Sequence, residues 1–399
     1  MKRFFVAIIL GTVSCYPSSI TLHDILSKST MHNPMQEALL EDALAKEAQY
    51  KGDHAPEPFT LHGTSGEVKP EFDRHTKEYA IGVSKQIFIN DSEALDNDIA
   101  HLQMKADTLD AEKKILNFDN GLKELYHKSC IQQKNNDAVK KLYDEFETLY
   151  AKKEKAYTYG EISKVELFYL KIEKEKLLTQ LKETEAMRTL SKETLYQLSG
   201  IPTAKDTVLA CTDMYPIVGS LSFADTLFAL SSEAYKNRIQ STQKLITRNK
   251  NVLDAVDVSL EYTHEVGIEK YIVGVSIPLH LNDKQSEQKR LEALHQSNAL
   301  EAKYRQNILE RHTQLHGLQT ELAYKSNVVN RMKKTIHEYQ QTLLPLLQKS
   351  YTYGESSVTE YILSKQQYYE LLQSFYTAQI SYYHALFALY TLSETKETL

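Results

Sequence analysis

Long stretches of the chain are polar but carry apolar residues at helical spacing. At a rise of 1.5 Å per residue, the two longest stretches each have room for a helix of about 90–100 Å. A single globular domain does not contain rods of that length, so the pattern favours an extended helical protein. The predicted helices span about 21–50, 91–155, 161–198, 221–250, 283–350 and 355–393.

The last of these helices carries tyrosines seven residues apart, which share one stripe along its surface. We predict that this stripe packs against a neighbouring helix and does not form a binding site. The tyrosines are Tyr369, Tyr376, Tyr383 and Tyr390.

Four shorter runs alternate between apolar and polar residues, as strands with one apolar face do. The predicted strands span about 59–65, 79–89, 256–264 and 271–281. The first two alternate less cleanly because Lys85 interrupts the apolar face, and we predict a polar loop at 65–77. Alternation alone also fits an ordinary soluble hairpin packed on a core.

Two landmarks recur at nearly the same separation along the chain. The segment Glu78–Asp91 matches Lys270–Asp283 with a shift of about 192 residues, and Tyr157–Glu161 matches Tyr351–Glu355 with a shift of about 194. The order of predicted elements also repeats, namely a helix, two strands and a long helical hairpin. We therefore predict a tandem duplication, with a first repeat at 16–205 whose hairpin tip lies near 160, and a second at 206–399 whose tip lies near 354.

The N-terminus has the character of an export signal, with Lys2 and Arg3 before a short apolar run. We predict a signal peptide at 1–15. Cleavage after Cys15 by an ordinary signal peptidase and cleavage before it, with acylation of Cys15, both remain open. Cys130 and Cys211 are far apart in sequence and are expected to stay free thiols.

Composition and motifs exclude several functional classes. The net charge of −6 mixes acidic and basic residues without a basic stripe, so nucleic acid is not an expected partner. Walker, GxSxG, zinc and dinucleotide motifs are absent from the sequence, so we expect no enzyme activity, no cofactor and no metal.

Export changes the interpretation of the strands. Open strand edges are not tolerated in hydrocarbon, and four strands cannot close a membrane barrel. Three copies would pool twelve strands, an even number suited to a barrel with a lumen. The strands therefore predict an oligomer in contact with membrane lipid, and a homotrimer suits a closed barrel.

Several short blocks, in order and partly duplicated, resemble the TolC-like outer-membrane efflux proteins over nearly the whole mature chain. They are His32–Pro34, Tyr159–Ser163, Leu198–Pro202, Gly274–Leu279 and Tyr353–Ser357. The resemblance implies a mainly α protein with a small β part: a trimeric α-barrel of long antiparallel helical hairpins plus a 12-stranded membrane β-barrel. It also implies an equatorial band near 200–220 and the C-terminus.

The resemblance further implies a passive duct from the periplasm through the outer membrane, serving efflux or type I secretion. Its partners would be a periplasmic adaptor protein and an inner-membrane pump, and the transported substrate stays undetermined. The alternative is an exported coiled-coil structural or adhesion protein without a channel, whose long helices would have a similar pattern.

The resemblance implies roles for specific residues of this chain. Glu166 and Glu360, six residues beyond each tip glycine, match a ring of acids that constricts the pore. Where the family often has a further acid and a gate-locking arginine, this chain has Leu363 and Ser356, so the closed state is expected to involve Tyr351. The residues that match the adaptor-docking tips are Gly160, Glu161, Gly354 and Glu355.

Overall fold

The computed structural model describes residues 19–32, 34–53, 55, 57–68, 76–201, 208–221, 227–250, 255–265, 267–277 and 284–395. The predicted signal peptide, including Cys15, lies outside the described residues. The chain divides into two compact units, to both of which the two longest helices contribute. The first comprises Met1–Pro34, Leu116–Leu227 and Gln314–Leu399, and the second comprises Met35–Ile115 and Phe228–Thr313.

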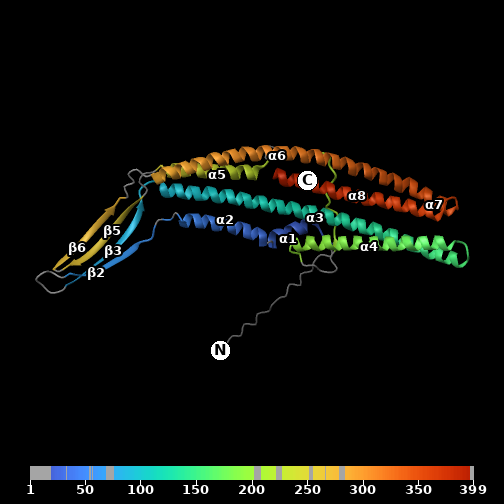
Figure 1. Ribbon diagram of the computed structural model, residues 1–399, viewed down its shortest axis with the longest axis horizontal. Helices are drawn as coiled ribbons and strands as arrows, with labels where there is room; N and C mark the ends of the chain where they lie inside the picture. Colours follow the sequence, from blue (N-terminus) through green and yellow to red (C-terminus); the bar gives the residue numbers. More distant parts are fainter. Residues whose placement is uncertain are drawn as a thin grey trace, which may run out of the picture. The chain divides into compact units, whose positions relative to one another are not determined.

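The helices follow the predicted pattern (Figure 1): α1 Leu22–His32, α2 Pro34–Asp53, α3 Ser92–Thr158, α4 Lys164–Leu198, α5 Ala229–Arg248, α6 Lys284–Glu338, α7 Leu344–Thr352 and α8 Val358–Ser393. The prediction of one helix at 283–350 is wrong, because the π-helical turn η1, Tyr339–Leu343, separates α6 from α7. Pro345 is the second residue of α7; it has no N–H to donate, and its ring crowds the preceding turn. The predicted helix at 21–50 is also divided, and α2 begins at Pro34.

In the first unit, α3 and α4 form one helical hairpin, and α6, α7 and α8 form another. A shared apolar core joins α3, α4 and α8, in which Leu142, Leu170 and Ile362 are almost completely buried. Burying such side chains is the main source of stability for helices whose surfaces are otherwise polar. The tyrosine stripe of α8 is part of this packing: Tyr369, Tyr383 and Tyr390 are buried, and Tyr376 is half-buried. The packing prediction is confirmed.

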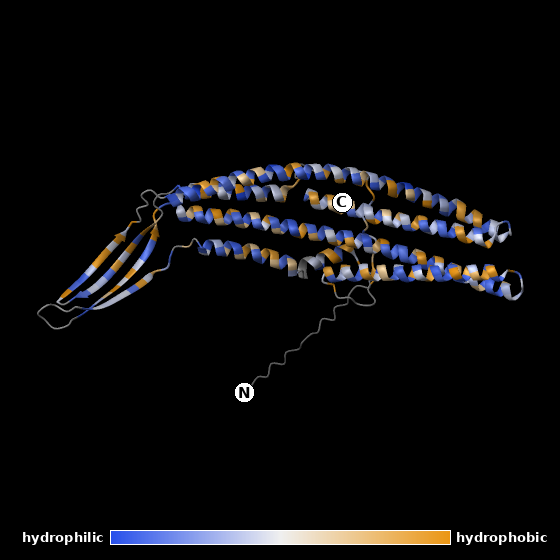
Figure 2. Cartoon of the chain, viewed as in Figure 1, coloured by the Kyte–Doolittle hydropathy of each residue, from blue (hydrophilic) through white to orange (hydrophobic). Residues whose placement is uncertain are grey.

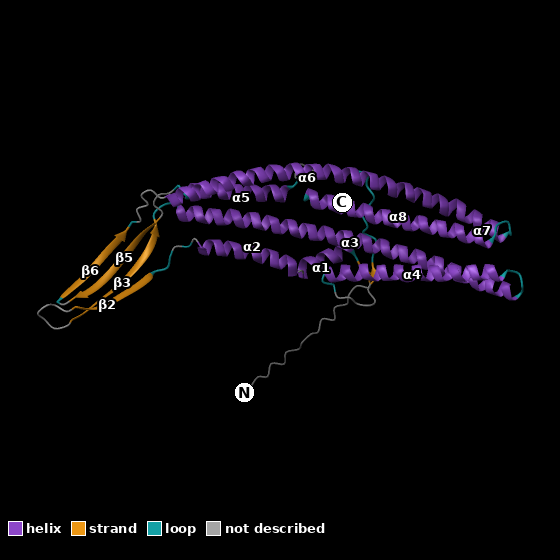
Figure 3. Ribbon diagram, in the orientation of Figure 1, coloured by secondary structure: helices purple, strands orange, loops and turns teal. Residues whose placement is uncertain are grey.

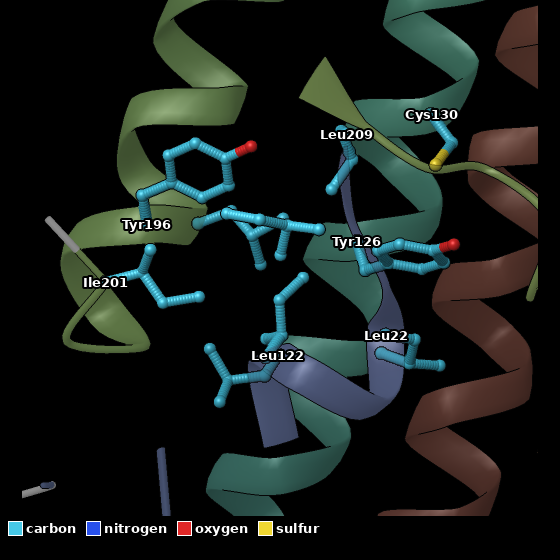
Figure 4. Packing of buried hydrophobic residues seen from close by; sticks show 10 residues of the cluster. Leu22, Leu122, Tyr126, Cys130, Tyr196, Ile201 and Leu209 are labelled. Carbon is cyan, nitrogen blue, oxygen red and sulfur yellow. The ribbon is translucent and has the colours of Figure 1, made fainter. Parts of the chain in front are cut away.

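A second core cluster surrounds the N-terminal part of the described chain. It collects residues from α1, α3, α4 and β4, among them Leu22, Tyr126 and Leu209, as Figure 4 shows. Two short strands, β1 Ser19–Ile20 and β4 Val208–Leu209, pair in parallel beside it.

The expectation of two free thiols is wrong, because Cys130 and Cys211 form a disulfide. The two Cα atoms are 5.6 Å apart although the residues are separated by 81 positions. Pairing of β4 with β1 folds the chain back onto α3, which carries Cys130. No local sequence pattern reports that contact.

In the second unit, α3 and α5 are joined by ion pairs. The Arg238 guanidinium lies 2.9 Å from Asp107 and 2.6 Å from Asp110, and Arg248 lies 3.1 Å from Asp96. None of the described helices, in either unit, is both long enough and apolar enough to cross a membrane.

The second unit also contains a four-stranded antiparallel sheet, in the order β2 Thr60–Val68, β3 Thr76–Phe88, β5 Ala255–Glu265 and β6 Ile268–Ser276 (Figure 1). All four strands lie near their predicted positions. The predicted loop at 65–77 is wrong at both ends, because β2 continues to Val68 and β3 begins at Thr76. Backbone hydrogen bonds extend the pairing through polar residues that an apolar pattern does not mark. The predicted end of the last strand, Leu281, lies outside the described residues.

The register gives the sheet one apolar and one polar face. Directly opposed residues share a face, so Val83, Leu260 and Val273 align in one apolar row. The apolar side chains are exposed: Leu61 is 74% exposed, and Val273 is 73% exposed. Figure 2 shows the hydrophobic residues recurring along these strands. Lys85 interrupts this face as predicted, with its ammonium 4.4 Å from the centre of the Phe59 ring.

Candidate functional site

The tip of the first hairpin is closed by a hydrogen-bonded turn at the end of α3. The Glu161 N–H donates to the Ala156 carbonyl at 2.9 Å, and the Gly160 N–H donates to the Tyr157 carbonyl at 3.0 Å. This pair of bonds needs a left-handed residue between them, and Gly160 supplies it with a φ of +75°. The turn reverses the chain and leaves Glu161 exposed at the tip.

The tip of the second hairpin, where Figure 3 shows a short loop between α7 and α8, has the same hydrogen-bonded turn. The Glu355 N–H donates to the Ser350 carbonyl at 2.9 Å, and the Gly354 N–H donates to the Tyr351 carbonyl at 3.1 Å. Gly354 has a φ of +74°. The match between the two tip sequences is therefore also a match in backbone geometry. Each tip exposes an aromatic ring, Tyr159 or Tyr353.

The two predicted constriction acids occupy equivalent positions but differ in their contacts. Each follows an N-cap serine by three residues, and its N–H donates to that serine's hydroxyl. The Glu360 carboxylate folds back and accepts a hydrogen bond from the Ser357 N–H at 2.8 Å, which completes a capping box. The Glu166 carboxylate instead lies 3.9 Å from the Lys153 ammonium. Sequence alone does not separate these two roles.

Tyr351 and Ser356, predicted near the constriction, are placed differently. The Tyr351 ring stacks on the Tyr361 ring with centroids 4.9 Å apart, and the Lys153 ammonium lies 5.8 Å from the Tyr351 centroid. Ser356 is half-buried, and its N–H reaches the Ser350 carbonyl at 3.4 Å. Tyr351 therefore contacts both hairpins, whereas Ser356 belongs to the turn of its own hairpin.

Polar contacts that the sequence does not reveal join the second hairpin to the first. Lys365 on α8 lies 2.9 Å from the Glu145 carboxylate on α3. Burial lowers the pKa of Lys365, but the hydrogen bond and charge of Glu145 outweigh this effect, so the pKa is raised above its usual value. The next residue, Gln366, donates to Glu173 on α4. We call these two contacts the tethers.

A groove of about 510 Å³ lies beside the tethers, between α3 and the α7–α8 part of the second hairpin. Tyr351, Tyr361 and Lys365 line it on one side, and Glu145 and Phe146 line it on the other. The groove borders the surface on which the two hairpins meet, and the tether from Lys365 to Glu145 forms part of its lining.

Further along α3 and α8, side chains fix residues 208–218, which we call the strap. The Tyr126 hydroxyl donates to the Ala210 carbonyl at 2.5 Å, and the Tyr383 hydroxyl donates to the Tyr215 carbonyl at 2.6 Å. With the disulfide at Cys211, these bonds hold the strap against the two helices. Residues 208–218, part of the segment for which the resemblance implies an equatorial band, are thus held against α3 and α8.

His127 is fully buried and also contacts the strap. Its Nε2 accepts the Tyr215 N–H at 2.8 Å, and its Nδ1 lies 2.7 Å from the Lys123 carbonyl, so the neutral ring with a proton on Nδ1 satisfies both partners. The rings of Tyr383 and Phe387 pack around it. Burial lowers the pKa of His127 to about 4.

No protein-family model and no curated protein matches the sequence. Solved structures do match. The Campylobacter jejuni CmeC outer membrane channel has a TM-score of 0.75 at 12% identity, covering 93% of this chain and 85% of CmeC. The outer membrane protein VceC from Vibrio cholerae has a TM-score of 0.73 at 14% identity, covering 93% and 96%. The open state of the Neisseria gonorrhoeae MtrE outer membrane channel has a TM-score of 0.72 at 11% identity, covering 93% and 88%.

This chain has the fold of these TolC-like channels. The predicted mainly helical protein with a small antiparallel sheet is confirmed, and the order of long helices and strands is that of the TolC-like fold over 93% of the chain. Among the described residues, no group of three or more histidine, cysteine or carboxylate side chains could hold a metal ion.

Proposed function

We propose that this chain is one subunit of an outer-membrane channel, a passive duct from the periplasm to the exterior that serves efflux or type I secretion and catalyses no reaction. The observation that carries the proposal is a TolC-like fold whose sheet exposes one mainly apolar face. An exposed apolar face suits contact with lipid, and the polar face on the other side of the sheet suits a water-filled lumen.

The working state is a homotrimer. In the described sheet, the edge strands β2 and β6 each have a neighbour on one side only. Unpaired backbone groups at such edges cost several kcal/mol each in hydrocarbon, so neighbouring copies would pair β6 with β2 until twelve strands close a barrel. The helical hairpins of three copies would then form the α-barrel in the periplasm.

The export signal at 1–15 directs the chain to this location, and residues 16–205 and 206–399 are two copies of one repeat. The identical turns at Gly160 and Gly354 support the duplication. Acylation of Cys15 would add a lipid anchor to the barrel's own hold on the membrane.

Glu166 and Glu360 form the pore constriction, with Tyr351 and Ser356 beside them. A three-fold axis would bring three copies of each acid together, which favours cations in the bore. Lys153 partly offsets the charge of Glu166, whereas Glu360 has no cation among its described partners and is aligned by Ser357. The tethers at Lys365 and Gln366 hold the second hairpin against the first and so favour the closed state.

The tips at Gly160, Glu161, Gly354 and Glu355 dock a periplasmic adaptor protein, through which an inner-membrane pump supplies the energy. Both tips are exposed, and both present the same turn and a tyrosine ring. A ring of six equivalent tips in a trimer would offer a repeated surface to a ring of adaptor subunits.

Planar-bilayer recording of the purified, detergent-extracted protein tests the proposal. We expect a trimer-sized species with cation-preferring conductance, and Glu166→Gln with Glu360→Gln should weaken the preference. A chain that is freed from membranes by alkaline washing and forms no pores would instead support the exported coiled-coil alternative. Unchanged selectivity in a conducting double variant would show that the two acids do not line the pore constriction, and it would leave the channel itself uncontradicted.

A further inference from the structure

One row of residues crosses the polar face of the sheet and contains a histidine–carboxylate pair. The register aligns His62 of β2 with Gly82 of β3, and Gly82 with Glu261 of β5. The His62 Nε2 lies 3.4 Å from Glu261 Oε2. The two side chains thus meet across an intervening strand, which requires that strand to leave room between them.

Gly82 provides that room. A Cβ atom added at Gly82 would collide with the His62 imidazole. The Thr263 hydroxyl donates to the other oxygen of Glu261 at 3.1 Å, so the carboxylate is positioned from two sides. The absence of a side chain at Gly82 leaves space for the His62 imidazole, and the Thr263 hydroxyl orients the Glu261 carboxylate toward it.

The second repeat shows that the arrangement is not a general property of this sheet. Gly274 of β6 matches Gly82 in the repeated sequence, but the side chain that covers it is the Ser259 hydroxyl. Ser259 carries no charge. The titratable pair, which joins His62 of the first repeat to Glu261 of the second, therefore has no counterpart at Gly274.

The charges around the pair are mostly negative. On the polar face, β3 adds Glu78, β6 adds Lys270, and β5 adds Asp257 and Glu265 to Glu261. Lys270 lies 2.5 Å from Glu265, so that ammonium is already paired. Among the described residues of this face, His62 is the ionisable contact of Glu261, and its protonation would cancel that carboxylate's charge.

We propose that the His62–Glu261 pairs of three copies form a ring that selects cations in a pH-dependent way. This ring lies in the part of the duct that is lined by strands, separate from the constriction at the helical tips. This rests on the proposed function, because it needs the polar face to line the lumen. Three-fold symmetry places three Glu261 carboxylates at one height. With neutral imidazoles they attract cations, and with protonated imidazoles the attraction is weakened.

The test is the reversal potential of single channels in a salt gradient at low ionic strength, where screening is weak. Wild-type channels should prefer potassium over chloride at least roughly fourfold more strongly at pH 8 than at pH 5. One unit charge about 10 Å from an ion in water favours potassium roughly twofold and disfavours chloride by the same factor, and three copies act together. The measurement is repeated in the double variant Glu166→Gln with Glu360→Gln, so that the acids near the tips do not dominate the reversal potential.

His62→Gln and His62→Asn should each abolish this pH dependence while leaving a conducting channel, and Glu261→Gln should lower the preference at pH 8. Gly82→Ala should weaken the pH dependence by displacing the imidazole. The matched variant Gly274→Ala, which crowds Ser259, should not. Full pH dependence in conducting His62 variants would overturn the inference alone. Absence of conductance in the wild type would overturn the proposed function as well.

Discussion

The Lys365 ammonium and the Glu145 carboxylate lie 2.9 Å apart and connect α8 of the second hairpin to α3 of the first. Removing this tether should shift the channel toward open states. An ion pair of this partly exposed kind contributes about 0.5–1 kcal/mol, so Lys365→Gln should raise the open-to-closed ratio in single-channel records roughly two- to fivefold for each tether that is lost.

Lys182→Gln is the control for the tether. Lys182 pairs with Glu185 at 2.9 Å within α4 alone, so its loss should leave gating unchanged. Equal effects of the two variants would show that Lys365 acts through general charge and not through its contact with Glu145.

The tip glycines should be sensitive to alanine. A Cβ atom in the left-handed conformation of Gly160 or Gly354 costs about 1–2 kcal/mol per site, and relief of that strain would reshape the turn. We expect Gly160→Ala and Gly354→Ala to lower unfolding stability by that amount and to weaken adaptor capture in pull-down assays. Gly121→Ala, inside α3 with open space around it, should instead gain up to about 1 kcal/mol and bind the adaptor normally.

The apolar face of the sheet should not accept a charge. Val273 lies near the middle of β6 and is 73% exposed on that face, so Val273→Arg places a guanidinium in lipid at a cost of about 2–4 kcal/mol per copy. Trimer yield in the outer membrane should fall sharply. Ser276→Arg, on the polar face of the same strand and opposite Asp257, should assemble nearly normally. Normal yield of Val273→Arg together with loss of Ser276→Arg would mean that the faces are assigned the wrong way round, and equal yields would contradict the assignment of one face to lipid.

His127 should make the stability of the first unit depend on pH. Burial lowers the pKa of His127 to about 4, below the usual value for histidine. As the pH falls from about 6.5 to about 4, the unfolded chain therefore gains a proton that the folded chain does not. The free energy of unfolding should decrease by roughly 3 kcal/mol over this interval and level off below it.

Denaturant unfolding in detergent across this pH range measures the effect. His127→Phe should be less stable at neutral pH, because the Tyr215 N–H loses its acceptor, but its pH slope should be flatter. His101→Gln, which removes an exposed histidine of the same helix, should keep the wild-type slope.

Much of the architecture could be predicted because it depends on neighbouring residues in the chain. Apolar spacing located the helices, alternation located the strands, and the repeated tip sequence predicted equivalent turns at Gly160 and Gly354. Where these predictions failed, the cause was local as well. Apolar spacing alone predicted one unbroken helix where a π-helical turn precedes Pro345. Backbone pairing with β3 extends β2 to Val68 through polar residues that the alternation did not mark.

The amino-acid sequence by itself thus determined the elements and their order, since periodicity and turn chemistry act over a few residues. Only the tertiary structure decided which distant groups meet: Cys130 with Cys211, Lys365 with Glu145, and His62 with Glu261. It also decided that Glu360 completes a capping box while Glu166 faces Lys153. These outcomes depend on strand register and helix packing, which bring together side chains whose separation along the chain carries no local signal.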